Sequence, residues 1–232
     1  MDEKKILIAL PMGGHIDSEF FSSFLGMRRV GKCKISMMID SLVYNARNSL
    51  VASAIDGKYD YILWLDSDMV FPPDTLERLL ADAEENNLDF VSGLCFKRVS
   101  PTCPTILKDL YWSQDDKGFI DRGCTFYKDY PKDSLFEVQG AGAAVLLTKV
   151  SIYSDVVKTF GIAPFEPLPA MGEDFSFCWR LKECGIKMWC DSRIKVGHIG
   201  KKIYDESVWE QEKQNAETVS TPESSAGESK AE

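Results

Sequence analysis

Apolar runs of strand length alternate with helical patterns through the first part of the chain. Four runs have the length and apolar content of buried strands, and three segments between them repeat apolar residues at helical spacing. Parallel strands need crossover connections, which are usually helices. The alternation therefore predicts an α/β fold with an open, mainly parallel sheet flanked by helices.

The expected elements continue beyond this alternating part. Residues 97–136 lose their periodicity and predict a long loop rich in aromatic residues, which is usually functional or an insertion. In chain order the expected elements are a strand at 5–10, a helix from Ser18, a strand at 33–38, a helix at 42–54, strands at 61–65 and 89–94 with a helix from Pro73 between them, a strand at 143–148, a helix at 150–160, a short helix from Gly172 and a last strand at 186–190.

Two carboxylates stand at the end of the third expected strand. Asp66 and Asp68 follow the apolar run 61–65, and the prolines of Phe71-Pro72-Pro73 then turn the chain. Ligands usually bind at the carboxyl edge of such a sheet, and carboxylates this close repel each other unless they hydrogen-bond, share a proton or meet a cation. A divalent metal is the simplest cation, and a plain turn carboxylate is the alternative interpretation.

The charge of the chain narrows its partners and its domain organisation. The formal net charge of −9 over 232 residues argues against a nucleic-acid backbone as the main partner. Part of the acidity is local, because seven Glu and two Lys follow Asp205 with few bulky apolar residues. We expect one folded domain at residues 1–204 and an acidic, disordered tail at 205–232.

Cysteine usage and the first residues bear on the compartment. The seven cysteines are an odd number, and no two are closer than six positions, which excludes a C-x-x-C pattern and disfavours a complete disulfide framework. Neither the beginning of the chain nor a later run is long and apolar enough for a signal segment or a membrane span. These observations predict a cytoplasmic protein without a transmembrane segment.

Several short motifs occur together in a set order. The motifs are Asn45-Ala-Arg-Asn48 on a helix, Leu65-Asp-Ser-Asp68 ending a strand, Phe71-Pro-Pro-Asp74, Gly140-Ala-Gly142 before a strand, Gly172-Glu-Asp174 opening a helix, and His198 after the last strand. With these motifs the chain resembles the nucleotide-sugar half of GT-A fold glycosyltransferases, especially the family 2 type, over about residues 5–200.

This resemblance implies a sugar transfer from a nucleoside diphosphate sugar to an acceptor that the motifs do not identify. It implies Mn²⁺ or Mg²⁺ as cofactor, with Asp66, Asp68 and His198 as metal ligands. The departing diphosphate gains negative charge in the transition state, and a fixed cation stabilises that change.

The resemblance also implies the substrate contacts. Arg47 is expected near the diphosphate or the base, and Asp66 near the ribose or the metal. Asp40 is expected either at the base or ribose or as the N-cap of the following helix, and Gly142 is expected to border the substrate. Trp112, in the aromatic segment, is expected to stack on a sugar ring, with local packing as the alternative.

The acidic pair Glu173 and Asp174 matches the pair near the acceptor in this family. Asp174 is the expected general base, which removes the proton of the acceptor hydroxyl, and Glu173 is the second catalytic candidate. An N-cap with acidic residues in the first helical turn is the structural alternative, and the two interpretations are compatible.

Two other functions fit parts of the sequence. Asp66-Ser-Asp68-Met-Val70 also fits the nucleophile motif of a haloacid dehalogenase-like phosphatase with Asp66 as nucleophile. About sixty residues of expected α/β structure precede it, however, whereas that family's motif normally lies near the start of the chain. The third candidate is a non-catalytic nucleotide-sugar-binding module.

Overall fold

The computed structural model describes residues 3–40, 42–99 and 102–200. The chain divides into two units after Ile199, so the expected tail at 205–232 lies outside the described residues. All seven cysteines are free thiols. Within the described ranges, no helix has both the length and the apolar character that crossing a membrane requires.

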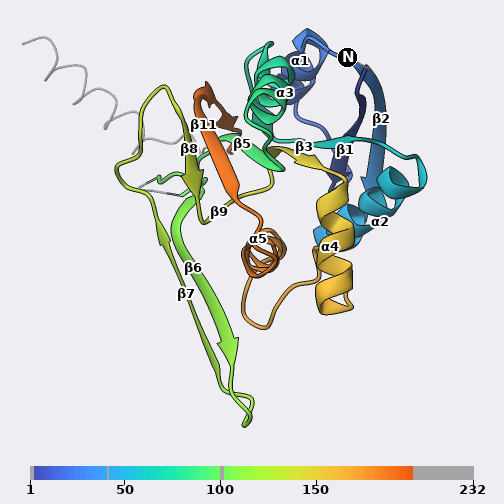
Figure 1. Ribbon diagram of the computed structural model, residues 1–232. Coiled ribbons are helices and arrows are strands. Elements are labelled where there is room, and N and C mark those ends of the chain that lie inside the picture. The colour runs from blue at the N-terminus through green and yellow to red at the C-terminus, as the bar shows by residue number, and fades with distance from the viewer. Residues whose placement is uncertain (1–2, 41, 100–101, 201–232) are drawn as a thin grey trace, which may run out of the picture. The chain divides into compact units, whose positions relative to one another are not determined.

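A seven-stranded sheet in the order β2-β1-β3-β10-β5-β11-β8 forms the centre of the first unit (Figure 1). The pairings orient β2, β1, β3, β5 and β11 in one direction, whereas β10 and β8 run in the opposite one. The mainly parallel sheet expected from the alternating pattern is confirmed. Its strands are β1 (Lys5–Met12), β2 (Lys32–Ile39), β3 (Tyr61–Leu65), β5 (Phe90–Leu94), β8 (Leu135–Val138), β10 (Val145–Lys149) and β11 (Met188–Lys195).

Helices cover both faces of this sheet, and each face has its own apolar core. Side chains alternate along β1 and β3, so that Leu7 and Trp64 join one core and Ile8 and Leu63 join the other. Because β3 is central, its five residues are all buried, and the chain becomes polar only where the strand ends. The helices are α1 (Ser18–Gly26), α2 (Val43–Asp56), α3 (Thr75–Glu85), α4 (Ser151–Phe160) and α5 (Glu173–Glu183).

The expected loop at 97–136 is wrong over much of its length. Residues Ile106–Gln114 (β6) and Ile120–Phe126 (β7) pair as an antiparallel hairpin, which extends away from the sheet in Figure 1. Only the beginning of β6 is regularly buried, and β7 is mostly exposed. The segment therefore lacks the alternation of a half-buried strand, which is the signal on which the sequence prediction depended.

Two short strand pairings connect the hairpin β6–β7 and residues 197–198 to the rest of the first unit. β9 (Gly140–Ala141) pairs with β6, and β12 (Gly197–His198) pairs with β4 (Met69–Val70) just beyond the carboxylates of β3. The β4–β12 pairing brings His198 next to a segment about 130 residues earlier in the chain. Tertiary pairing thus determines which polar residues meet at the carboxyl edge.

Two of these helices show how the sheet selects which side chains are buried. On α1, Phe20 and Phe24 are buried, but Phe21 and Leu25 are exposed, because the helix contacts the core along a narrow stripe. On α2, Arg47 is 2% exposed although it is charged. The polar side of α2 faces the end of β3, where other charged groups meet it.

On α5 the apolar side chains are buried to different degrees. Cys178 and Leu181 are buried, whereas Phe175 and Trp179 are only partly buried. Arg180 is fully buried and donates to the carbonyl oxygen of Pro164 at 3.0 Å.

Candidate active site

The carboxylate of Asp66 is held by an arginine from α2. Arg47 Nη2 lies 2.9 and 3.2 Å from the two carboxylate oxygens of Asp66, and Nη1 donates to the carbonyl oxygen of Ala143 at 3.3 Å. Since these residues come from α2, the end of β3 and the segment before β10, the contact fixes three parts of the fold around one guanidinium.

Arg47 also reaches the acidic pair of α5. Its Nε lies 3.5 Å from Glu173 Oε1, and its guanidinium lies over the Trp64 ring at 5.5 Å from the centroid. Burial by itself would lower the pKa of Arg47, but Asp66 and Glu173 outweigh burial and raise it. The arginine therefore stays charged and holds two of the expected site carboxylates in place.

Asp68 points to a different set of partners. Its Oδ2 lies 3.3 Å from His198 Nε2 and 3.0 Å from Arg98 Nη1. Burial raises the pKa of Asp68, but the hydrogen bond and charge of His198, together with Arg98, outweigh it and lower the pKa. For His198 burial lowers the pKa, and the contact with Asp68 reverses the direction and raises it. The two carboxylates of the motif thus diverge, Asp66 toward Arg47 and Asp68 toward His198.

Asp68 and His198 form a donor pair that suits a divalent cation. His198 Nδ1 lies 2.8 Å from the carbonyl oxygen of Phe96, and because a carbonyl only accepts, Nδ1 carries a proton. In the neutral imidazole the lone pair is then on Nε2, directed toward the carboxylate of Asp68. Two acceptors that face each other need a proton or a cation between them, and one oxygen with one nitrogen ligand suits Mn²⁺.

The third expected metal ligand is not part of this pair. Across residues 3–40, 42–99 and 102–200, no three His, Cys, Asp or Glu side chains gather as a metal-binding group. Asp66 is engaged by Arg47 instead. A metal held by Asp68 and His198 would complete its shell with water and diphosphate oxygens, as Mg²⁺ and Mn²⁺ commonly do in sites of this kind.

Among the described residues, Asp174 forms no ion pair, unlike the other carboxylates of the site. It stands in the first turn of α5, where its Oδ1 accepts from the backbone N–H of Phe175 at 2.7 Å. Burial and, to a smaller degree, the charge of Glu173 raise the pKa of Asp174 to about 7. A carboxyl group tuned close to neutral pH is suited to accept and release protons.

Gly142 lets the backbone approach this carboxyl group. A Cβ at this position would lie 3.3 Å from Thr105 Oγ1 and 3.6 Å from Asp174 Oδ2. Its N–H donates to the carbonyl oxygen of Thr105 at 3.1 Å. A side chain at residue 142 would therefore fill space beside Asp174 that is otherwise open to a ligand.

Two cavities meet at the carboxylate pair. A cavity of about 230 Å³ lies on the side of β1 and β2 and is lined by Asp40 and by Pro11, Met12 and Gly13 at the end of β1. A cavity of about 210 Å³ lies on the side of α5 and is lined by His198, Asp174 and Gly142. Asp66 and Asp68 line both, so the two cavities form the two sides of one candidate site at the carboxyl edge of the sheet.

Asp40 and Trp112 have different positions relative to these cavities. Asp40 lines the first one, and its Oδ1 also accepts from the backbone N–H of Leu42 at 3.0 Å, just before α2. Trp112 lines neither; it packs edge-on against Trp179 of α5 at 5.4 Å and donates to the carbonyl oxygen of Pro169 at 3.2 Å. These contacts match the local packing alternative for Trp112.

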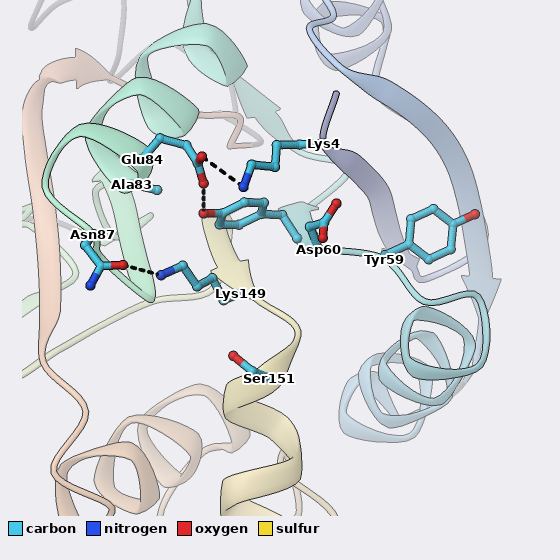
Figure 2. Close-up of a pocket in the computed structure, with 9 residues that line it drawn as sticks. Lys4, Tyr59, Asp60, Ala83, Glu84, Asn87, Lys149 and Ser151 are labelled. Carbon is cyan, nitrogen blue, oxygen red and sulfur yellow. Dashed lines mark hydrogen bonds and ion pairs between the residues drawn. The ribbon is translucent and has the colours of Figure 1, made fainter. Parts of the chain in front are cut away.

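A third cavity, of about 410 Å³, lies at the amino-terminal end of β3, opposite the candidate site (Figure 2). Lys4 pairs with Glu84 at 3.0 Å, and Lys149 Nζ donates to Asn87 Oδ1 at 3.0 Å. Tyr61 also donates to Glu84. This cavity is lined by two cations, Lys4 and Lys149, and by two anions, Asp60 and Glu84. The charges of the lining residues are therefore balanced without a ligand.

Arg98 and Thr105 were missed by sequence reasoning, and both line the cavity beside α5. Arg98 follows the end of β5 by a few residues, and a basic residue beyond the carboxyl end of another parallel strand was a usable signal. Thr105 had no such signal, because it reaches the site through the base of the unexpected hairpin.

Sequence comparisons agree with this geometry. The family model described as glycosyl transferase family 2 matches residues 43–136, a range that includes Arg47, Asp66 and Asp68. The curated mannan polymerase complex subunit mnn9 of Schizosaccharomyces pombe (strain 972 / ATCC 24843) is 25% identical over 131 residues. That alignment covers 47% of this chain and 38% of the relative, so the chain spans less than half of the relative's length.

Solved structures share the fold. A197 from STIV superposes with a TM-score of 0.57 at 17% identity, over 85% of this chain and 86% of that one. GalNAc-T7, whose crystal structure contains UDP, GalNAc and Mn²⁺, superposes with a TM-score of 0.50 at 11% identity, over 86% of this chain and 44% of that one. The chain therefore has the GT-A fold of these structures, and residues 43–136 are similar to the family 2 glycosyl transferases.

Proposed function

We propose that this protein is a metal-dependent glycosyltransferase, which moves a sugar from a nucleoside diphosphate sugar to an acceptor hydroxyl. The observation that carries the proposal is the group of carboxylates at the carboxyl edge of β3, where the two cavities meet. These carboxylates outnumber the guanidinium groups around them. The α5-side cavity is lined by four carboxylates, Asp66, Asp68, Glu173 and Asp174, and by two guanidinium groups. The excess negative charge favours a bound cation.

The donor would lie across both cavities. The nucleoside fits the side of β1 and Asp40, and the diphosphate fits the carboxylate pair, with Asp68 and His198 as metal ligands. A bound divalent ion would neutralise the charge that develops on the departing diphosphate. Arg47, fixed by Asp66 and Glu173, would add a positive charge that needs no rearrangement during the reaction.

Asp174 would act as the general base. Among the carboxylates beside α5, Asp66 and Glu173 are committed to Arg47 and Asp68 to His198 and Arg98, whereas Asp174 accepts only from the backbone in the contacts described. With its pKa raised to about 7, it can take the proton of an acceptor hydroxyl as the new glycosidic bond forms. Glu173 contributes by raising that pKa and by holding Arg47.

The alternative with Asp66 as a phosphatase nucleophile is disfavoured by the same contacts. A nucleophilic carboxylate needs an oxygen that can reach the substrate phosphorus. Both Asp66 oxygens lie within 3.2 Å of Arg47 Nη2, which competes for their lone pairs.

The test is calorimetric titration of the whole chain with nucleoside diphosphates and their sugars, with and without Mn²⁺. Mannose donors come first because the relative's name contains mannan, and UDP-GalNAc second because of the GalNAc-T7 complex. We expect binding that requires Mn²⁺ and that Asp68→Ala weakens about 100-fold, since the variant removes a direct ligand.

Asp121→Ala is the matched control, because Asp121 is exposed on β7 and lines neither cavity of the site. It should bind as the wild-type protein does. Nucleotide binding that ignores Mn²⁺, or that Asp68→Ala leaves unchanged, would overturn the metal-dependent mechanism.

A further inference from the structure

Arg98 contacts the oxygen of Asp68 that also faces His198. Arg98 Nη1 lies 3.0 Å from Asp68 Oδ2 and donates to the carbonyl oxygen of Ile199 at 3.2 Å. His198 Nε2 approaches the same Oδ2 at 3.3 Å. A guanidinium therefore neutralises the carboxylate at the place where the proposed metal would bind.

The contact is built differently from that of Arg47. The side chain of Arg98 is 51% exposed, whereas that of Arg47 is 2% exposed. Arg47 is held by two carboxylates and a carbonyl oxygen, whereas Arg98 contacts, among the described residues, one carboxylate and one carbonyl oxygen. Because half of the Arg98 side chain is exposed to water, this pair contributes less to stability than a buried one.

A metal ion and a guanidinium compete for this carboxylate. Both are positively charged, and at contact distance from one oxygen they repel each other. A nucleoside diphosphate offers Arg98 a new partner at the same edge of the sheet, because guanidinium groups bind phosphate oxygens with two parallel hydrogen bonds.

We propose that Arg98 is an exchangeable binding residue, which neutralises Asp68 before the metal binds and contacts the donor diphosphate afterwards. This inference rests on the proposed function. Arg98 would lower the affinity for the metal alone and raise the affinity for the nucleotide in the presence of metal. The two ligands would therefore bind cooperatively, because each removes the cost of separating Arg98 from Asp68.

The test measures the two affinities separately on the whole chain. Arg98→Met removes the charge and keeps much of the length of the side chain. Titration of free Mn²⁺, followed by electron paramagnetic resonance without nucleotide, should show about threefold tighter binding in Arg98→Met, as expected for an exposed ion pair. Calorimetry with UDP or GDP at saturating Mn²⁺ should show about tenfold weaker binding.

Opposite signs are the signature of exchange. A residue that only supports the fold would weaken both affinities, and a fixed diphosphate ligand would change the second alone. Arg98→Lys keeps the charge and should give values between the wild-type protein and Arg98→Met. Arg122→Met, at an exposed position on β7, is the matched control and should change neither affinity by more than about twofold.

The measurements distinguish a failure of the proposed metal-dependent function from a failure of the role of Arg98. A wild-type chain that does not bind Mn²⁺ overturns the metal-dependent function, and this inference with it. If the wild-type chain binds Mn²⁺ and Arg98→Met leaves that affinity unchanged or weakens it, the role of Arg98 alone is overturned. Urea unfolding of Arg98→Met should match the wild-type protein, which separates binding from folding.

Discussion

The cavities at the two ends of the central strands differ in the balance of charge among their lining residues. The one at the amino-terminal end of β1 and β3 is larger, about 410 Å³, and its two cations and two anions balance. The one beside α5 has about 210 Å³ and is lined by four carboxylates and two guanidinium groups. An excess of one charge in a partly buried site favours a ligand of the other charge. Unmatched charge, and not volume, therefore distinguishes the candidate active site.

The largest effect is expected from removing the proposed general base, Asp174. Asp174→Asn keeps the shape but cannot accept a proton, so the rate of sugar transfer should fall about 10²- to 10⁴-fold while donor binding changes little. Initial rates and calorimetry measure the two quantities. Glu183→Gln, at the exposed end of the same helix, is the control.

The pH dependence of the wild-type rate follows from the same group. Because burial raises the pKa of Asp174 to about 7, the reactive carboxylate is lost as the pH falls through that value. The rate should therefore decrease on the acid side of about pH 7, and Asp174→Asn should lack this limb. An acid limb that persists in the variant would assign the base to another group.

The second prediction separates buried from exposed ion pairs. Arg47→Leu leaves Asp66 and Glu173 without their cation, so the free energy of unfolding should fall by about 3–5 kcal/mol. Arg78→Leu removes an exposed pair with Asp74 at 2.6 Å and should cost less than about 1 kcal/mol. Urea unfolding gives both values, and equal losses would contradict the fixed role of Arg47.

The third prediction concerns a pair of carboxylates, Asp82 and Asp191, that line none of the three cavities described. Asp82 of α3 and Asp191 of β11 share Arg193, whose nitrogens lie 2.7 and 2.8 Å from one oxygen of each. Burial and then the hydrogen bond and charge of Asp191 raise the pKa of Asp82 to about 6. The folded state thus binds a proton more tightly than the unfolded state.

Stability should accordingly be complete below about pH 4 for this pair and should fall as the pH rises through about 6, by about 1 kcal/mol once screening by solvent is allowed for. Asp82→Asn should remove this part of the pH dependence. Urea unfolding at pH 4.5 and pH 7 in both proteins measures it, and an identical slope in the variant would refute the pairing.

The smallest effect is expected at the opposite cavity. Lys149→Met breaks exposed contacts with Asn87 and Asp89, each at 3.0 Å (Figure 2 draws the first). It should lower the free energy of unfolding by less than about 1 kcal/mol and leave the transfer rate within about twofold. A tenfold loss of the transfer rate would show that this cavity takes part in the function, and would contradict the assignment of the active site by its unmatched charge.

The fold was predictable where one physical signal decided it. Buried central strands such as Tyr61–Leu65 are continuously apolar, and helices between them repeat at their own period, so both could be read directly. The hairpin β6–β7 was not predictable in this way, because it extends from the sheet and buries little of either face.

The sequence by itself determined the α/β class, the carboxylates at the end of β3 and the order of the motifs around them. The tertiary structure decided how those groups pair. Asp66 and Asp68 are two residues apart, yet one meets Arg47 from α2 and the other meets His198 and Arg98 from the ends of β12 and β5. These contacts depend on the crossover connections and on the β4–β12 pairing, which bring together residues up to 130 positions apart. A local sequence pattern cannot show which of such distant residues will be in contact.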